Sequence, residues 1–541
     1  MTHRPGRLPT VLAALLYASV ITMSAWEAGS DQASDQDRTN MDVTTLSELE
    51  LQKLLATGEL SASTVTAAYL QRIAELDAQG PMLNAIIQVN PDAARIATEL
   101  DEAFSRTGPL GPLHGLPVVL KANIDTGDEM ATSAGSLALA DHKATADAHL
   151  VTALRGAGAV IIGKSNLSEW ANFRDSNSSS GWSSLGGQTR NPYVLDLNPC
   201  GSSSGSAVAV AAALAPLAVG TETNGSIVCP AGVNGVVGIK PTVGLVSRTG
   251  ILPISHTQDT AGPMARSVAG AALLLQSLVD YDSSDAGAIR LSADPAALLP
   301  DTTRTDLKGR RIGILRTYKG VGTRPRVEAI YQQAVERLEV LGAALVDPVE
   351  YRSTPAMRGA SYRVLLHEFK AGLNAYLTAH ELPEHLNSLS DLIVYNRARQ
   401  ERVMPFFGQS IFLDAEASTG LEDSDYLESR SASQDQLRSD IDSLFATQQL
   451  DALFLPVNGP AWKTDWINGD QSGYGSTAYL AAITGYPSIV LPAGTVNGLP
   501  VAVGFMGLAQ TDAELIQMAY ALEQSLPELP LPEYLPTLEQ P

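Results

Sequence analysis

The chain has 541 residues, of which 45% are hydrophobic and 17% are charged, and it contains 45 glycines and 31 prolines. This composition indicates a globular protein with many turns and excludes a mainly disordered or coiled-coil chain. The formal net charge of -22 would repel a polyanion, so we expect no nucleic-acid partner.

The N-terminal 42 residues have the pattern of an export signal. Arg4 and Arg7 precede an apolar run, Leu8–Met23, and a polar stretch follows that run. The run is shorter than the ~20 residues that cross a bilayer, so the pattern predicts a signal peptide over residues 1–26 and a polar linker over 27–42. We therefore expect an exported protein, periplasmic or secreted, whose mature chain has no stable membrane insertion. An uncleaved N-terminal anchor is the alternative.

Helical and strand patterns alternate from residue 43 onwards. Leu46–Leu55 and Ser63–Leu76 have apolar residues at helical spacing, and short β-branched runs separated by helical patterns follow them. This alternation predicts an α/β fold: a single large domain over residues 43–530, with a mixed, largely parallel β-sheet covered by helices on both faces. The predicted strands are Ala85–Val89, Pro117–Leu120, Ala159–Ile162, Leu217–Gly220, Val236–Ile239, Arg311–Leu315, Ala344–Val346, Leu450–Pro456, Ser488–Leu491 and Val501–Gly507.

One part of the predicted domain departs from this alternation. Residues 351–447 show mostly helical patterns, which fits an insertion that faces the substrate and fits equally well a layer that packs against the sheet. Residues 531–541 form a short tail.

The segment Gly158–Ser165 matches the phosphate-loop pattern G-x-x-x-x-G-K-[ST], which would predict nucleotide binding. A phosphate loop needs exposed backbone N–H groups between its glycines. Here the intervening residues, Ala-Val-Ile-Ile, form a β-branched run that should be a buried strand. We therefore predict no nucleotide site.

The segment Gly201–Gly205 matches the nucleophile elbow G-x-S-x-G and would make Ser203 a nucleophile. An elbow follows directly on a hydrophobic strand, whereas the residues before this segment are rich in turn formers. The catalytic triad of that fold also needs a late histidine, but the last one, His385, lies over 150 residues before the C-terminus. This interpretation is rejected.

Three other segments suit nucleophilic catalysis when taken together. Lys121 ends an apolar strand, Cys200–Ser206 is a loop of small residues, and Gly220–Ile227 places a tight turn after a strand. In such a turn, consecutive backbone N–H groups can converge on one oxygen, so the third segment can supply both a serine nucleophile and an oxyanion hole. Taken alone, each segment is explained better as an ordinary turn, or as a lysine at the end of a strand, than as part of a catalytic site.

Together these segments resemble the amidase signature family, and the resemblance runs from about residue 43 to 525. Their order and spacing carry it. The resemblance implies the amidase signature fold and hydrolysis of amides. The matching stretches are Gly115–Lys121, Gly163–Trp170, Cys200–Gly205, Gly220–Pro230, Gly238–Thr242 and Gly262–Val268.

The resemblance also implies roles for individual residues. The nucleophile falls on Ser226, the bridging serine on Ser202 and the general base on Lys121. Relatives often have Asp or Gly at the position of Asn224, but a backbone donor there should stay usable. The oxyanion donors are the backbone N–H groups of Thr223, Asn224, Gly225 and Ser226. The supporting residues, expected to hold the catalytic loops by hydrogen bonds, are Ser203, Ser204, Asp259 and Arg266.

Amide hydrolysis needs an activated nucleophile, a stabilised oxyanion and a protonated leaving nitrogen. A free lysine has a pKa of ~10.4, so a lysine base must be kept neutral by burial away from carboxylates. The place of Lys121 at the end of an apolar strand is consistent with burial. We expect no metal and no organic cofactor, because the histidines lack ligand spacing.

The chain has two cysteines, Cys200 and Cys229, and both flank the proposed catalytic loops. One disulfide is possible if the protein is exported. We nevertheless predict two free thiols in small buried side chains, because no histidine lies near either cysteine in the sequence to activate it.

Further stretches resemble the bacterial peptide amidases within this family: Asn172–Arg174, Gly187–Tyr193 and Val246–Arg248. Arg174 and Trp170 fit a structural role and a substrate contact equally well. The resemblance implies that an acyl-enzyme forms and that C-terminal amides of peptides, or similar small amides, yield a carboxylic acid and ammonia. The protein is expected to be a monomer or a homodimer.

Three other functions are alternatives. The first is an amidase that acts on small aliphatic or aryl amides. The second is the amidase subunit of a tRNA-dependent amidotransferase, which the export pattern argues against. The third is a binding protein without activity, which the presence of Lys121, Ser202 and Ser226 argues against.

Overall fold

A computed structural model describes residues 42–538 of the chain. The predicted signal peptide and nearly all of the predicted linker lie outside these residues. Within the described part, no helix combines the length and the apolar character that crossing a membrane requires.

The centre of the fold is a mixed sheet of eleven strands in the order β1-β3-β2-β6-β8-β7-β12-β13-β11-β9-β10. Strands β3, β2 and β6 pair in parallel, as do β11, β9 and β10, whereas the strands from β6 to β11 pair antiparallel. Strand β1 also pairs antiparallel with β3. The predicted mixed sheet is confirmed, but it is not largely parallel: the four parallel pairings lie on its two sides and the other six pairings are antiparallel.

The strands are β1 (Ile86–Val89), β2 (Pro117–Lys121), β3 (Val160–Ser165), β6 (Leu217–Glu222), β7 (Val237–Lys240), β8 (Thr260–Ala265), β9 (Arg311–Leu315), β10 (Ala344–Val349), β11 (Ala452–Asn458), β12 (Ser488–Val496) and β13 (Leu499–Met506), and a separate pair is formed by β4 (Trp182–Ser183) and β5 (Gly187–Gln188).

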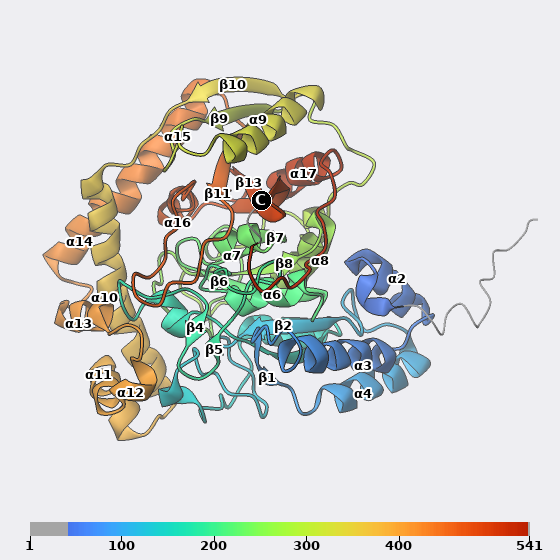
Figure 1. Ribbon diagram of the computed structural model, residues 1–541, viewed down its shortest axis with the longest axis vertical. Coiled ribbons are helices and arrows are strands. Elements are labelled where there is room, and N and C mark those ends of the chain that lie inside the picture. The colour runs from blue at the N-terminus through green and yellow to red at the C-terminus, as the bar shows by residue number, and fades with distance from the viewer. Residues whose placement is uncertain (1–41, 539–541) are drawn as a thin grey trace, which may run out of the picture. The chain divides into compact units, whose positions relative to one another are not determined.

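Helices cover this sheet (Figure 1). Helices α6 and α7 contact each other and pack on strands between β2 and β13, and helices α8 and α17 form a second contacting pair on β7, β8, β12 and β13. The helices are α2 (Glu48–Thr57), α3 (Ala62–Arg72), α4 (Ala93–Thr107), α5 (His149–Gly156), α6 (Ser204–Ala211), α7 (Val228–Val233), α8 (Val268–Leu278), α9 (Pro325–Val340), α10 (Pro355–Ala379), α11 (Leu389–Ala398), α12 (Gln400–Val403), α13 (Ser410–Ala417), α14 (Ser424–Arg430), α15 (Gln436–Gln448), α16 (Tyr479–Thr484) and α17 (Asp512–Glu523).

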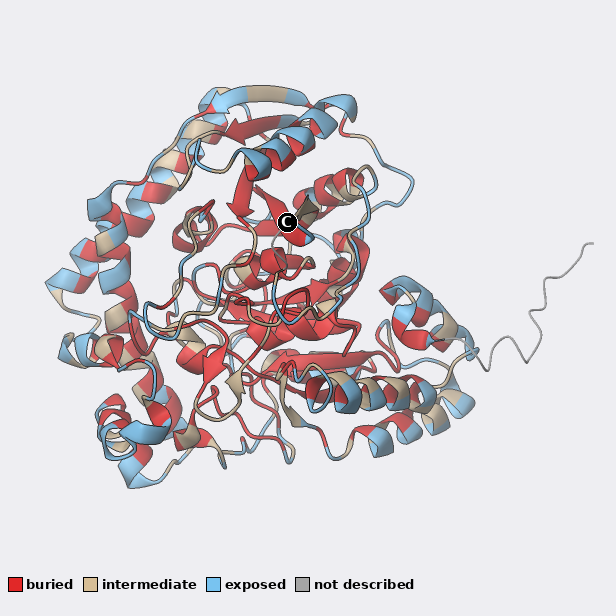
Figure 2. Ribbon diagram, viewed as in Figure 1, coloured by how far each residue is buried: buried red, intermediate tan, exposed pale blue. Residues whose placement is uncertain are grey.

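The central strands are buried along their whole length (Figure 2). Their sequences are continuous apolar or small-residue runs, such as Pro-Val-Val-Leu in β2, because both faces are covered by other elements. The sequence patterns therefore located the strands within a few residues. Strand β8 was not predicted, because its sequence Thr-Ala-Gly-Pro-Met-Ala contains Gly and Pro, which are depleted in strands.

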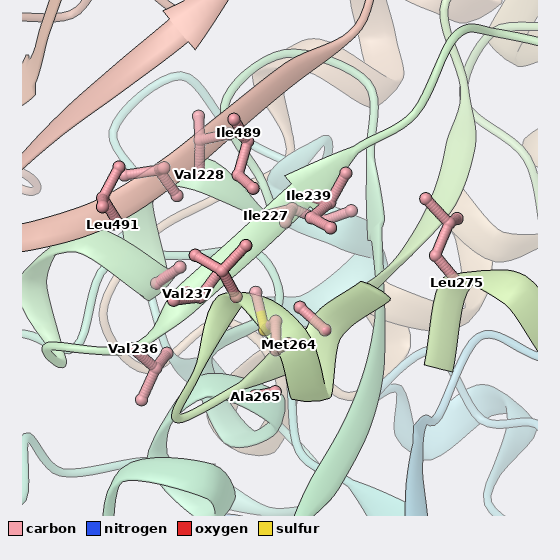
Figure 3. Packing of buried hydrophobic residues seen from close by; sticks show 14 of the residues in the cluster. Ile227, Val228, Val236, Val237, Ile239, Met264, Ala265, Leu275, Ile489 and Leu491 are labelled. Carbon is pink, nitrogen blue, oxygen red and sulfur yellow. The ribbon is translucent and has the colours of Figure 1, made fainter. Parts of the chain in front are cut away.

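The residues that follow the turn after β6 enter the core directly. Ile227 and Val228 pack with Ile239 of β7, Met264 of β8 and Ile489 of β12 (Figure 3). Burying one such aliphatic side chain contributes about 1.5–3 kcal/mol, so this packing fixes the end of the turn. The turn itself is consequently held on a rigid support.

Residues 351–447 form helices α10 to α15. Helix α10 begins after Thr354, whose hydroxyl accepts a hydrogen bond from the Met357 N–H, and Pro355 fits its first turn. Apolar side chains of α10, α11 and α13 form a core of their own with Trp170, while α15 contributes to the main core through Phe445. This part of the chain thus packs both on the main core and on the segment around Trp170.

Candidate active site

Lys121 is the last residue of β2, and its side chain is completely buried. Its Nζ donates hydrogen bonds to the Ser202 Oγ at 2.7 Å, the Thr221 Oγ1 at 2.8 Å and the Thr221 carbonyl at 3.1 Å. All three partners are hydroxyl or carbonyl oxygens, which can accept from an amine in either charge state. The direct contacts of the amine therefore do not force it to be charged.

Burial lowers the pKa of Lys121 from its ordinary value of 10.5 to about 7. The cause is the loss of hydration of the ammonium form, and the negative charges of Asp259 and Glu222 oppose it only in part. Near neutral pH a large fraction of this side chain is consequently an uncharged amine, which can accept a proton.

Ser202 lies in the serine-rich loop that precedes α6, and its side chain is completely buried. Its hydroxyl accepts the hydrogen bond from Lys121, and its carbonyl accepts one from the Ser168 N–H at 3.1 Å. Gly201 permits the close approach of these segments, because a Cβ at that position would lie 2.1 Å from the Ser168 Oγ. A side chain at position 201 would therefore displace Ser168 or the loop.

The neighbouring serines hold this loop in place. The Ser203 Oγ donates to the Thr221 carbonyl at 3.0 Å, and the Ser203 N–H donates to the Ser226 carbonyl at 3.1 Å. The Ser204 Oγ donates to the Cys200 carbonyl at 2.6 Å. Both serines thus make the loop contacts expected of supporting residues, and Ser203 joins the loop directly to the residue predicted as nucleophile.

The turn Thr223–Ser226 lies between β6 and α7. Glu222, just before it, is buried, and its Oε2 accepts hydrogen bonds from the N–H groups of Ile227 at 2.7 Å and Val228 at 3.0 Å. No hydrogen-bond acceptor within residues 42–538 is found for the backbone N–H groups of Asn224, Gly225 and Ser226. Glu222 therefore fixes the turn from one side and leaves three consecutive backbone donors available.

Asp259 holds the other side of the turn. Its Oδ1 accepts a hydrogen bond from the Thr223 Oγ1 at 2.6 Å, and its Oδ2 accepts from the N–H groups of Ile254 and Ser255, both at 2.8 Å. Burial raises the pKa of Asp259 to about 6. This carboxyl group connects the turn to the segment around Ile254.

Ser226 is 8% exposed, whereas Ser202 and Lys121 are 0% exposed. No hydrogen bond of the Ser226 hydroxyl is found within the described residues, and so none joins it to Ser202. Hydrogen bonds between catalytic groups commonly tighten only when substrate binds. The structure therefore contains the contact from Lys121 to Ser202, and it brings Ser226 next to them through the Ser203 N–H.

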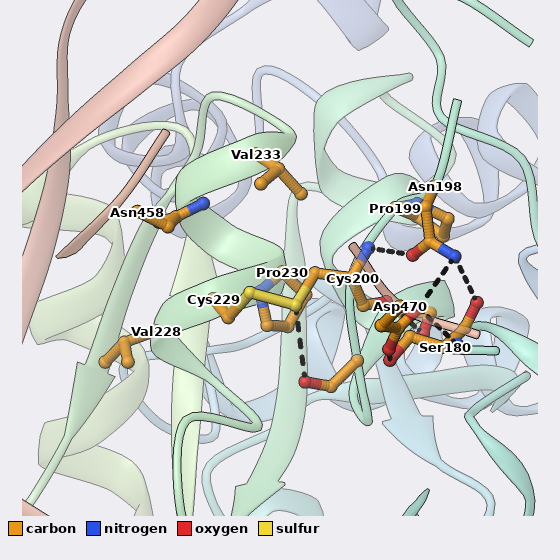
Figure 4. Close-up of a disulfide and its surroundings, with 12 residues drawn as sticks. Ser180, Asn198, Pro199, Cys200, Val228, Cys229, Pro230, Val233, Asn458 and Asp470 are labelled. Atoms are coloured by element: carbon orange, nitrogen blue, oxygen red, sulfur yellow. Dashed lines mark hydrogen bonds between the residues drawn. A yellow bond between two sulfur atoms is a disulfide. The ribbon is translucent and has the colours of Figure 1, made fainter. Parts of the chain in front are cut away.

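Cys200 and Cys229 form a disulfide, with their Cα atoms 6.0 Å apart (Figure 4). The prediction of two free thiols is therefore wrong. A separation of 29 residues in the sequence hides the proximity of the serine-rich loop and the first turn of α7. The Asn234 side chain adds a second link, because its Nδ2 donates to the carbonyls of Pro199 at 2.9 Å and Pro230 at 2.7 Å.

Arg266 is the predicted supporting residue that the structure does not bring to this site. Its guanidinium group donates to the carbonyls of Thr44, at 3.0 Å, and Leu46, and its N–H donates to the Glu48 carboxylate at 2.9 Å. It therefore fastens the N-terminal helix α2 to the end of β8. The prediction that it ties the catalytic loops is wrong, because this partner segment lies over 200 residues earlier in the chain.

Arg174 and Trp170 have structural surroundings. Arg174 forms an ion pair with Glu169 at 2.7 Å, in which both side chains are 0% exposed, and it lies over the Phe407 ring at 4.4 Å. Trp170 packs edge-on against Phe412 with ring centroids 5.6 Å apart. Neither residue lines the cavity described below, so the structural interpretation of both is favoured.

The structure also agrees with the rejection of the phosphate-loop match and of the nucleophile-elbow match. The residues Val160–Ser165 of the phosphate-loop match form strand β3 and are all buried. The Lys164 Nζ within it donates to the carbonyl of Ile124. Ser203 of the elbow match follows no long strand, because the preceding element is the two-residue β5.

A cavity of about 630 Å³ lies beside Lys121 and the turn Thr223–Ser226. Asn123, Thr221 and Thr223 line the side of the cavity next to Lys121. Helices α10 and α14 contribute Tyr376 and Arg430 to its lining. The helical segment 351–447 thus supplies part of the wall of this cavity, which is large enough for a ligand of several residues.

Among the described residues, one group of side chains has the composition of a metal site: Asp125, His142 and His380, whose ligand atoms all lie within 4.8 Å of one another. None of these residues was singled out from the sequence, because the positions are far apart in the chain.

The comparisons with known proteins agree with the geometry. The family model Amidase matches residues 64–516. The chain belongs to the amidase family. Its fold is similar to the crystal structure of peptide amidase from Stenotrophomonas maltophilia, with a TM-score of 0.85 and 48% identity, covering 91% of this chain and 99% of that chain.

Two curated relatives show the range of this amidase family. A probable amidase from Arabidopsis thaliana is 37% identical over 482 residues, covering 86% of this chain and 87% of the relative. The A subunit of the glutamyl-tRNA(Gln) amidotransferase from Pseudomonas syringae pv. tomato is 35% identical over 485 residues, covering 88% of this chain and 96% of the relative. The resemblance found in the sequence is confirmed, and the amidase is a hydrolase that acts on amide C–N bonds.

Four residues of the amidase site were not singled out from the sequence. Thr221 and Glu222 lie in the matched stretch Gly220–Pro230, but no function was predicted for them. Their position at the end of β6, just before the turn, could have indicated a place in the site. Asn123, whose Nδ2 donates to the Thr221 Oγ1 at 3.1 Å, and Asn234 act through contacts distant in the sequence. No local pattern could reveal these two.

We predict that the double substitution Cys200→Ala and Cys229→Ala lowers both stability and turnover of the amidase. Opening a covalent loop across a separation of 29 residues costs about 3.6 kcal/mol of free energy of unfolding in the chain-entropy model. The two serine loops also gain freedom, so kcat should fall about tenfold or more while KM changes little. Tm and steady-state rates of amide hydrolysis measure the two effects.

The control is Cys229→Ala alone, which should behave like the double variant, because either change removes the disulfide. Titration of thiols in the unreduced, denatured wild type should find none. Two reactive thiols per chain, or an unchanged kcat in the double variant, would contradict the prediction.

Proposed function

We propose that this amidase hydrolyses C-terminal amides of peptides to the free acid and ammonia, with Ser226 as nucleophile, Ser202 as bridging serine and Lys121 as general base. The observation that carries the proposal is the buried Lys121 amine, which donates to the Ser202 hydroxyl at 2.7 Å beside a turn with three unpaired backbone donors among the described residues. An amine with a pKa of about 7 can take up a proton near neutral pH.

In the first step, the Ser226 Oγ attacks the carbonyl carbon of the amide. The Ser226 proton passes to the Ser202 oxygen while the Ser202 proton passes to the Lys121 Nζ. Negative charge develops on the former carbonyl oxygen. The N–H groups of Asn224, Gly225 and Ser226 are available to stabilise it, because they have no other acceptor in residues 42–538.

In the second step, the C–N bond breaks and the nitrogen leaves as ammonia. It takes a proton from Ser202, which is replaced from the Lys121 ammonium, so the relay returns to its starting state. Water, activated by the same relay, then attacks the ester between the acyl group and Ser226. The carboxylic acid leaves and the Ser226 hydroxyl is restored.

The substrate class is inferred from the cavity and from the relatives. About 630 Å³ is more space than a small aliphatic amide fills, and the walls combine apolar groups with a few polar ones. The solved structure with 48% identity over 99% of its chain is a peptide amidase. Both observations favour a peptide amide over a small amide.

Two further observations bear on the alternative that the chain is the amidase subunit of an amidotransferase. The solved A subunit of the glutamyl-tRNA(Gln) amidotransferase from Thermotoga maritima is 25% identical with a TM-score of 0.67, below the values for the peptide amidase. The disulfide and the N-terminal export pattern fit an oxidising compartment, so we also propose that the protein is exported. A cytoplasmic complex that modifies tRNA is therefore disfavoured.

Substitution of the two serines tests the catalytic roles. Ser226→Ala should lower kcat by about 10⁴-fold or more, because no acyl-enzyme can form, and Ser202→Ala should lower it by orders of magnitude. Mass spectrometry of enzyme treated with a sulfonyl fluoride should place the label on Ser226. Ser105→Ala, at an exposed serine of α4 outside the site, is the control and should retain full activity. Labelling of Ser203, or activity in Ser226→Ala, would overturn the assignment.

The pH dependence of kcat/KM tests the base. Only neutral Lys121 accepts a proton, so kcat/KM should rise with pH through an apparent pKa of about 7 and fall below it. Asp259→Asn distinguishes the two titrating groups of the site. The negative charge of Asp259 raises the pKa of Lys121, so its removal should move the limb to lower pH. If the rise of kcat/KM with pH disappears in Asp259→Asn, the titrating group is Asp259 and not Lys121.

A substrate panel tests the proposed specificity. Purified protein incubated with an amidated peptide should release ammonia and the free peptide acid, with internal peptide bonds intact, at a higher kcat/KM than with acetamide or benzamide. Glutamine in the presence of tRNA is the control for the amidotransferase. Faster hydrolysis of the small amides would contradict the proposed preference for peptide amides and would leave only general amide hydrolysis.

A further inference from the structure

A cluster of polar groups contacts Tyr376, one of the residues that line the cavity. The cluster consists of Asp125 in the loop after β2, His142 in the loop after the short helix Leu137–Leu139, and His380, which follows the last residue of α10. Asp125 is 2% exposed, and the side chain of His380 is 20% exposed. The ligand atoms of the three residues lie within 4.8 Å of one another. The proposed catalytic relay uses none of them.

The hydrogen bonds of Tyr376 orient two of these groups. The Tyr376 hydroxyl donates to the Asp125 Oδ1 at 2.6 Å, which leaves Oδ2 facing the His380 Nε2 at 2.9 Å. The His380 Nδ1 lies 2.9 Å from the Tyr376 carbonyl. A carbonyl can only accept, so Nδ1 carries a proton, and Nε2 is the nitrogen that faces the Asp125 carboxylate. A metal ion bound between Nε2 and Oδ2 would take the place of the proton in this contact. Hydrogen bonds of this kind on the outer nitrogen are typical of histidines that bind metals.

The third member of the cluster closes the arrangement. The His142 Nε2 lies 3.4 Å from the Tyr376 hydroxyl, and the rings of His142 and His380 are perpendicular with centroids 5.3 Å apart. Among the ion pairs of the described residues, Asp125 contacts His380. Lys164, the buried lysine nearby, donates to the carbonyl of Ile124 instead.

We propose that Asp125, His142 and His380 bind one divalent transition-metal ion of the zinc type. Two imidazole nitrogens and one carboxylate oxygen are a donor set that suits Zn²⁺ better than Mg²⁺ or Ca²⁺, which take oxygen ligands. Zinc bonds of about 2.0–2.2 Å separate neighbouring tetrahedral ligand atoms by roughly 3.3 Å. The Asp125 and His380 atoms, at 2.9 Å, need to separate by only a few tenths of an ångström.

The bound ion cross-links the end of α10 to the loop after β2. Tyr376 lines the cavity and contacts both Asp125 and His380, so the ion also fixes this part of the cavity wall. Its role in the proposal is structural, and no step of amide hydrolysis passes through it. The site consequently stands or falls independently of the proposed substrate.

Calorimetric titration of the untagged, chelator-treated protein with Zn²⁺ tests the site. We expect one Zn²⁺ per chain, with no comparable binding of Mg²⁺, and a higher Tm in the presence of Zn²⁺ because the ion binds the folded chain. His380→Gln and His142→Gln should each lower the affinity at least tenfold. His385→Gln, a substitution at an exposed histidine of the same region, is the matched control and should bind Zn²⁺ like the wild type.

Each result decides the question. One equivalent of Zn²⁺ in the wild type and in His385→Gln, with affinity at least tenfold lower in both cluster variants, supports the site. Absence of binding to the wild type overturns it, and so does a smaller loss of affinity in either cluster variant. If His380→Gln fails to fold, His142→Gln decides, because its 3.4 Å contact with Tyr376 is the weakest in the cluster.

Discussion

The Lys121 amine lies in the interior of the protein, and its partners are the hydroxyl groups of Ser202 and Thr221 and a carbonyl oxygen. A lysine in this position loses the hydration that normally keeps it charged. Lowering its pKa from 10.5 to about 7 corresponds to roughly 5 kcal/mol of destabilisation of the charged form. A carboxylate in direct contact would reverse this effect, so the whole site depends on keeping carboxylates away from the amine.

Two carboxylates do lie near Lys121, and both accept hydrogen bonds from other groups. Glu222 accepts from the backbone at the start of α7, and Asp259 accepts from Thr223 and from the segment around Ile254. Each carboxylate therefore shapes the turn that carries Ser226 instead of pairing with the lysine. The same contacts that protect the neutral amine leave the backbone donors of the turn unoccupied. Around them, the Cys200–Cys229 disulfide and Asn234 connect the two serine loops.

Local sequence patterns were sufficient for the strands and for the segments of the site. Continuous apolar runs identified the buried strands, and the family resemblance identified Lys121 and Ser202, which the structure brings into contact. Three features were missed for one shared reason. The disulfide, the partners of Arg266 and the Asp125 cluster all depend on residues distant in the chain, which the fold alone brings together. Strand β8 failed for a local reason, since tertiary pairing overrides the poor strand propensity of Gly and Pro.

The most direct test of this account is the protonation of Lys121 itself, measured by NMR titration of the protein with ¹³C-labelled lysine side chains. Lys164 and Lys240 are also buried, with pKa values lowered to about 8, so the Lys121 signal is assigned by its loss in Lys121→Met. We predict a midpoint near pH 7 for this signal. A Lys121 side chain that remains charged above pH 10 would contradict it, because Ser202 would then have no base.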